Sequence, residues 1–91
     1  MVGVIEEHIE VVPGLGGPKA RIVGHRIRVQ DVAIWHEKLG LSPDEIVEQH
    51  PEITLADVHA ALAYYWDHRD EIEQAIAAEQ AFAAEFRKRW E

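Results

Sequence analysis

The sequence contains no cysteine, which excludes disulfide bonds, thiolate metal sites and thiol catalysis. Positive charge is also scarce, since 9 Lys and Arg residues face 17 Asp and Glu residues and give a net charge of −8. A chain of this charge is repelled by nucleic acids and anionic membranes unless it carries a local basic patch. Any contact with DNA must therefore come from a cluster of its few cations.

Long apolar runs are missing as well. No stretch is apolar for about 18 residues, so we expect no membrane-spanning helix. The first residues are acidic and lack an apolar core, so we expect no signal peptide. Together with the absence of cysteine, these features predict a cytoplasmic protein. The chain is also too short for a cofactor-binding domain beside a substrate domain, so we expect no cofactor.

The chain has 91 residues, which is enough for one small domain. Hydrophobic residues make up 47% of it and charged residues 29%, a balance typical of a globular protein rather than a disordered one. We therefore look for one compact core with short elements.

The first third of the chain has the pattern of short strands. Residues 8–12 are mostly β-branched and alternate with polar residues, so they predict a strand. Five of the six residues in 13–18 are Pro or Gly and predict a loop. Residues 20–29 predict two further short strands around a turn at Gly24 and His25, the second with Arg26 and Arg28 on one face.

From residue 31 onward the sequence pattern predicts helices. Asp31 is expected to cap a helix over 32–39, with Val32, Trp35 and Leu39 on its buried side and Gly40 at its end. Two stronger signals for a helix N-terminus come next along the chain. Ser42 with Glu45, and Thr54 with Asp57, have the spacing of capping boxes, and they predict helices over 43–50 and 55–67.

A further helix is expected over 70–90, because neither Gly nor Pro occurs after Pro51. Its apolar residues are spaced nearly as in a heptad seam. The residues that we assign to a partner-binding surface are Ile72, Ile76, Phe82, Phe86 and Trp90. Packing on the chain's own core and dimerisation are the alternatives for this seam.

Three short helices after a small hairpin are typical of a helix-turn-helix domain with a wing, and also of a simple helical core. We predict a mainly α fold with a small β-hairpin, in which residues 1–69 form the helix-turn-helix-like part and 70–91 the C-terminal helix. Residues 42–68 contain no Lys or Arg, so the helix after Thr54 is a weak candidate for reading DNA.

The basic residues Lys19, Arg21, Arg26 and Arg28 are better candidates for DNA contact, because they lie within ten residues that contain no acid. The alternative is that these cations pair with the chain's own acidic helices or with a second copy.

Catalytic and metal chemistry have little support. The six histidines are scattered and form no His-x₃-His or His-Glu-x-x-His pattern, so we expect no metal site. The one serine, Ser42, is accounted for by its capping position. We therefore expect a protein that is not an enzyme.

Two stretches resemble the family called domain of unknown function 433. Residues 16–29, GGPKARIVGHRIRV, resemble its Gly-Lys-Pro-x-Ile-x-Gly-Thr-Arg-Ile-x-Val signature, with His25 in place of Thr and Pro18-Lys19 in reversed order. Residues 40–65, GLSPDEIVEQHPEITLADVHAALAYY, are similar to its second motif. The resemblance extends over roughly residues 9–68.

The resemblance implies a winged-helix-like or homeodomain-like fold and an antitoxin role of the VapB type. Members of the family are often encoded beside a PIN-like ribonuclease toxin, which they are expected to neutralise while repressing their own operon. For this chain it implies a homodimer whose C-terminal helix covers the toxin and whose folded part binds operator DNA. The alternative is a homo-oligomeric protein-interaction module that binds no DNA.

Overall fold

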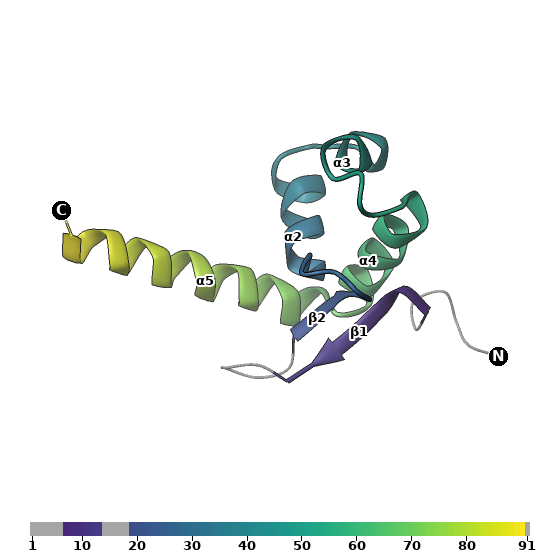
Figure 1. Cartoon of the computed structure of the whole chain (residues 1–91). Coiled ribbons are helices and arrows are strands. Elements are labelled where there is room, and N and C mark those ends of the chain that lie inside the picture. The colour runs from purple at the N-terminus through teal and green to yellow at the C-terminus, as the bar shows by residue number, and fades with distance from the viewer. Residues whose placement is uncertain (1–6, 14–18, 91) are drawn as a thin grey trace.

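The computed structural model describes residues 7–13 and 19–90, and for Trp90 it describes the backbone alone. Nearly all of the loop predicted over 13–18 thus lies outside the described residues. The strands are β1 (Ile9–Val12) and β2 (Lys19–Ile22), and the helices are α2 (Val29–Ala33), α3 (Pro43–Gln49), α4 (Leu55–Asp67) and α5 (Arg69–Trp90). A π-helical turn, η1 (Ile34–Lys38), continues α2. The described chain is mainly helical with one small sheet (Figure 1).

The sheet consists of β1 and β2, paired antiparallel with Ile9 opposite Ile22 and Val12 opposite Lys19. Ile9 and Ile22 are buried and both strands contact α4, so the sheet covers one side of the helical body. The strand predicted over 8–12 is confirmed. The strand predicted at the end of 20–29 is wrong, because there only Arg28 forms a bridge, to Arg21, before α2 begins.

Asp31 explains where that second strand is lost. Its carboxylate accepts a hydrogen bond from the backbone N–H of Arg28, 3.0 Å away, as the third residue of a capping box. The helix therefore begins at Val29, and the prediction that Asp31 itself is the cap is wrong by three residues. Val29 is fully buried as a helical residue instead of a strand residue.

The helix predicted over 32–39 changes its winding at η1. The N–H of Leu39 donates to the carbonyl of Ile34, five residues earlier, which adds one residue to the turn. This extra residue alters which side chains face the core. Leu39, expected to be buried, is 64% exposed. Gly40 ends the segment with a positive φ of 74°, as its position predicts.

Both predicted capping boxes are confirmed. The N–H of Glu45 donates to the Ser42 hydroxyl at 3.2 Å, and the N–H of Asp57 donates to the Thr54 hydroxyl at 3.1 Å. The reciprocal bonds to the Glu45 and Asp57 carboxylates are also present. These local bonds set the starts of α3 and α4.

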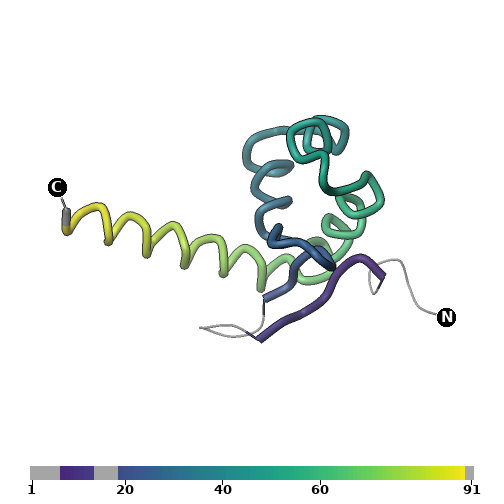
Figure 2. Tube along the Cα trace, viewed as in Figure 1, coloured from purple at the N-terminus to yellow at the C-terminus, as the bar shows by residue number. Residues whose placement is uncertain are grey.

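The core lies where α4 meets its neighbours, since α4 contacts α2, α3, α5 and both strands. Its largest fully buried side chains are Tyr65, Ile22, Ile46, Ile53, Val29, Val32 and Val58. The second half of α5 leaves this body and extends into solvent (Figure 2), which makes the described molecule 49 Å long but only 28 by 22 Å across. Within the described chain, no helix combines the length and the apolar character needed to cross a bilayer.

Candidate interaction surfaces

The first half of α5 belongs to the core. Ile72 is 7% exposed and Ile76 is 3% exposed, and this part of the helix packs on α2 and α4. Their spacing predicts that both belong to a partner-binding surface, and for these two residues the prediction is wrong. They fill the core beside α2 and α4 and offer almost no surface to a partner protein.

Polar contacts hold the same half of α5 in place. The Lys38 ammonium lies 2.7 Å from the Glu73 carboxylate, and the Tyr65 hydroxyl donates to its other oxygen at 3.1 Å. The hydrogen bond from Lys38 lowers the pKa of Glu73 below its usual value. Glu73 thus links α5 to η1 and to α4.

Glu79 also ties α5 to the body. The Arg28 guanidinium donates to its carboxylate at 3.0 Å and also to Asp31 at 2.8 Å, and these acids raise the pKa of Arg28. The amide of Gln30, a side chain buried to 5% exposure, donates to Glu79 as well. Sequence spacing marks Glu79 only as a polar break in the apolar seam, because its partners lie about fifty residues away.

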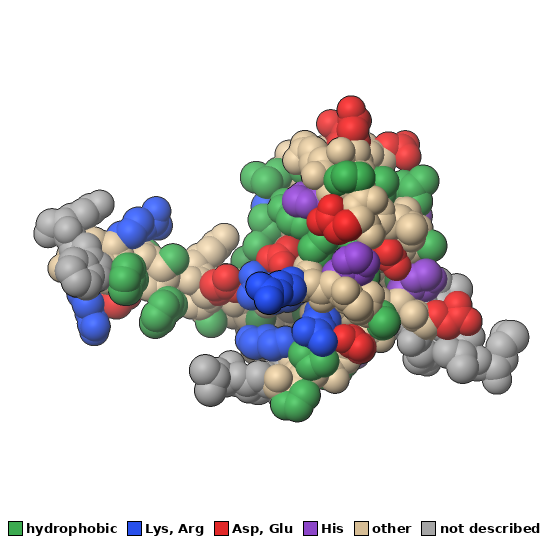
Figure 3. All heavy atoms as spheres, viewed as in Figure 1, with side chains coloured by type: hydrophobic (Ala, Val, Ile, Leu, Met, Phe, Trp, Pro, Cys, Tyr) green, Lys and Arg blue, Asp and Glu red, His purple; other side chains and the backbone are tan. Residues whose placement is uncertain are grey.

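Beyond Glu79 the helix exposes its apolar residues. Phe82 is 73% exposed and Phe86 is 54% exposed, and they are large side chains that a monomeric protein normally buries. The side chain of Trp90, the remaining residue of the predicted surface, lies outside what the structure describes. Figure 3 shows hydrophobic side chains on the surface of the projecting helix, with Lys and Arg side chains near its end.

A notch lies at the base of this projecting part. It is lined by Ile34 of η1 and by Ile76, Glu79, Gln80 and Ala83 of α5, and its surface is mostly apolar. The notch and the exposed seam are continuous, because Ala83 belongs to both. We define the distal stripe as Ala83 and Phe86, with Phe82 on its flank.

The four basic residues do not form one free patch. Arg21 donates to Glu10 at 2.7 Å across the β-ladder, and Arg28 is bound to Asp31 and Glu79. Among the described residues, Lys19 and Arg26 have no carboxylate partner. The alternative of pairing with the chain's own acids therefore applies to Arg21 and Arg28, while Lys19 and Arg26 remain available for other contacts.

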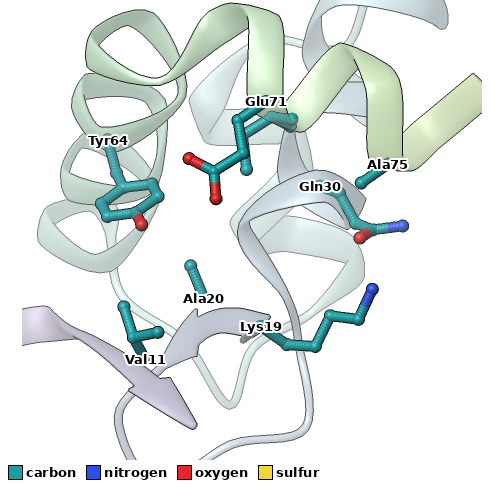
Figure 4. A pocket seen from close by; sticks show the side chains of 8 residues that line it. Val11, Lys19, Ala20, Gln30, Tyr64, Glu71 and Ala75 are labelled. Carbon is teal, nitrogen blue, oxygen red and sulfur yellow. The ribbon is translucent and has the colours of Figure 1, made fainter. Parts of the chain in front are cut away.

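A second hollow lies between the sheet and the start of α5 (Figure 4). Lys19 and Gln30 flank it on one side, and Tyr64 and Glu71 face each other across its other end. Burial raises the pKa of the Tyr64 hydroxyl, and the charge of Glu71 adds to this effect. The hollow has a volume of only about 50 Å³, so it is too small for a cofactor.

Several of the histidines contact other groups of the folded chain. The His8 ring lies 2.7 Å from the Asp57 carboxylate, His36 contacts the carbonyl of Leu41, and His50 stacks on Trp35 with the ring centres 4.1 Å apart. Among the described residues, no group of three or more His, Asp or Glu side chains is arranged to hold a metal ion. The contact with His8 also occupies Asp57 at the start of α4, the helix that was the weaker candidate for DNA contact.

Comparison with known proteins gives two matches. The family model described as "Protein of unknown function (DUF433)" matches residues 9–65. The fold resembles the crystal structure of a DUF433 member protein from Anabaena variabilis, with a TM-score of 0.67 and 30% sequence identity over 80% of this chain and 71% of that one. No curated protein matches the chain.

Proposed function

The chain belongs to the DUF433 family, and we propose that it is the antitoxin of a toxin–antitoxin pair, of the VapB type. In this proposal the distal stripe of α5 binds and neutralises a small PIN-like ribonuclease. The observation that carries it is the second half of α5, which leaves the body with Phe82 and Phe86 exposed. A projecting amphipathic helix suits insertion into the groove of another protein.

The positive charge at the end of α5 also supports a ribonuclease as the partner. Arg87, Lys88 and Arg89 follow one another at the end of α5, next to the apolar residues of the stripe. A nuclease with an acidic catalytic site offers the complementary charge, and such complementarity increases both association rate and specificity. An apolar stripe that ends in three cations therefore suits an apolar groove beside an acidic centre.

The test is co-expression of the chain with the ribonuclease encoded beside its gene, followed by purification through a tag on the ribonuclease. We expect an equimolar complex that cleaves RNA far more slowly than the free enzyme. Phe82→Ala with Phe86→Ala should weaken the complex by at least about tenfold, since exposed aromatic residues are common binding hot spots.

The matched control is Leu55→Ala, which removes an apolar side chain that is 43% exposed at the start of α4, away from α5. It should leave the complex intact. The proposal fails if the ribonuclease and the chain do not copurify, or if the Leu55 and Phe variants bind equally well.

DNA binding is the second candidate function, and Lys19 and Arg26 are the observation that favours it. In this candidate function α2, α3 and α4 act as a winged-helix-like or homeodomain-like unit, and the hairpin cations contact operator phosphates as the protein represses its own operon. With Arg21 and Arg28 bound to carboxylates, the contact rests mainly on Lys19 and Arg26.

Titration of the DNA upstream of the gene at several salt concentrations tests this function. Each phosphate contact contributes about −0.9 to the slope of log K against log salt, so Lys19→Ala with Arg26→Ala should make the slope shallower by about two. Absence of binding at low salt would leave a protein-interaction module that binds no DNA.

A further inference from the structure

We infer that Arg28 and Gln30 form a binding site for a phosphate-type oxyanion, and that the Glu79 carboxylate occupies this site when no ligand is bound. The inference goes beyond the proposed function, because it concerns a small anion and requires neither a ribonuclease nor DNA. It rests on three features of the molecule: the way the two donors are held, the exposure of Glu79 and the positive charge around the site.

The donors of Arg28 and Gln30 converge on one oxygen atom of Glu79. Nη1 of Arg28 donates to Oε2 of Glu79 at 3.0 Å, and the Gln30 amide donates to the same oxygen. Nη2 of Arg28 donates to the other carboxylate oxygen at 3.3 Å. One edge of the guanidinium therefore binds both oxygens of the anion, which is the geometry that arginine offers to carboxylates and phosphates alike.

Both donors are held in place by groups other than Glu79. Nε and Nη2 of Arg28 donate to Asp31 at 3.2 and 2.8 Å, and the bridge to Arg21 fixes the backbone of Arg28. Gln30 is almost fully buried, so the packed core restricts its side chain. Donors that stay in position when one acceptor leaves lose little entropy when they bind another.

Glu79 can leave the site without any movement of α5. Its side chain is 52% exposed, and among the described residues only Arg28 and Gln30 bind its carboxylate. Ile76, about one turn earlier, stays packed in the core and holds the helix in place. Rotation of the Glu79 side chain into solvent would therefore free both donors, so Glu79 competes directly with an external anion.

The charge around the site favours phosphate as the ligand. Once Glu79 has rotated away, Arg28 and Lys19 supply two positive charges against the single negative charge of Asp31. Lys19 flanks the hollow of Figure 4 on the same side as Gln30, and it has no carboxylate partner among the described residues. A carboxylate has only two oxygens, whereas a phosphate has further oxygens and a larger charge for Lys19.

The first experiment follows the side-chain amide resonance of Gln30 by NMR as inorganic phosphate is added, with sodium chloride at equal ionic strength as the blank. We expect a saturable shift that chloride does not cause. Glu79→Ala should lower the dissociation constant for phosphate by at least about tenfold, because the competing carboxylate is gone. Glu85→Ala is the matched control and should leave the constant unchanged, since Glu85 is on the same helix and has no cation partner among the described residues.

A second experiment tests the role of Gln30 through stability. Glu79→Ala leaves both donors without this acceptor, and phosphate should restore part of the lost stability in urea unfolding, because a ligand that binds only the folded chain stabilises it. Gln30→Met keeps a side chain of similar length but removes the donor. In the Glu79→Ala background it should abolish the restoration, and a restoration that persists would overturn the role of Gln30.

The inference fails if phosphate causes no saturable shift in the wild-type chain, or if the Glu79→Ala and Glu85→Ala variants bind phosphate equally. A short duplex from the DNA upstream of the gene, titrated in the same way, distinguishes the sources of the phosphate. A shift with the duplex would assign the site to a nucleic-acid backbone, and a shift with phosphate alone would assign it to a free phosphate compound. Either shift supports the oxyanion site. The phosphate titration contains neither ribonuclease nor DNA, so it can fail while the proposed function holds.

Discussion

In the first half of α5, Ile72 and Ile76 are buried against α2 and α4, whereas in the second half Phe82 and Phe86 are mostly exposed. Both halves continue one helix with one apolar seam. The difference comes from the surroundings, since α2 and α4 cover the first half of α5 and the second half projects beyond the body. Apolar spacing therefore identifies a helix face that is stabilised by burial against another surface. The tertiary structure determines whether that surface belongs to the same chain.

The strongest test of this contrast is Ile76→Ala. Removing a side chain that is 3% exposed should lower the free energy of unfolding by about 3 kcal/mol, through lost burial and the cavity left behind. Urea unfolding followed by circular dichroism measures it. A loss below about 1 kcal/mol would show that the first half of α5 is not part of the core.

The boundary between the halves is tested by Glu79→Ala. This change leaves the buried Gln30 amide and part of the Arg28 guanidinium without their acceptor, and we expect a loss of about 1 kcal/mol. Amide hydrogen exchange should also become faster in α5 around residue 79. Glu85→Ala is the control, since Glu85 has no cation partner among the described residues, and an equal loss there would contradict the role of Glu79.

Acid should loosen the first half of α5 through Glu73. Its pKa is lowered in the folded state by Lys38, so its contribution to stability is complete above the unfolded pKa near 4.5 and is lost as pH falls through the lower folded value. Because the pair is largely exposed to solvent, the loss should stay below about 1 kcal/mol.

Urea midpoints measured from neutral pH down into the acid range test this prediction. Glu73→Gln should remove this part of the pH dependence, whereas Glu85→Gln should keep it. The same pH dependence in wild type and Glu73→Gln would assign it to other carboxylates, such as Asp57.

The smallest effect is expected for Phe82→Ala. At a protein concentration too low for self-association, the free energy of unfolding should change by no more than about 0.5 kcal/mol, because the ring is 73% exposed. Urea unfolding is again the measurement. A loss comparable to that of Ile76→Ala would mean that Phe82 packs on the body, and the contrast between the halves would disappear.

Features that depend on neighbours in sequence were predictable. The capping boxes at Ser42 and Thr54, the positive φ of Gly40 and the strand β1 all agree with the sequence patterns. The second strand of the 20–29 segment was predicted wrongly, because alternation at Arg26 and Arg28 resembles a strand, although the cap from Asp31 draws the chain into a helix.

The candidate surfaces were only partly predictable. The sequence identifies Phe82 and Phe86 as interface candidates, but it places Ile72 and Ile76 in the same class, although these two are buried in the core. It also groups Arg28 with Lys19 and Arg26, although Arg28 is bound to Glu79, 51 residues away. No local pattern contains such a contact.

The sequence by itself determined where the helices α3 and α4 begin, the length of α5 and the membership of a family. Capping bonds and helix propensity act between residues a few positions apart, so they can be seen in the order of residues. Only the tertiary structure decided which half of α5 is buried and which cations are neutralised. Burial and ion pairing depend on segments that meet only when the chain folds. In the folded chain, α2 and α4 cover the first half of α5 but not the second.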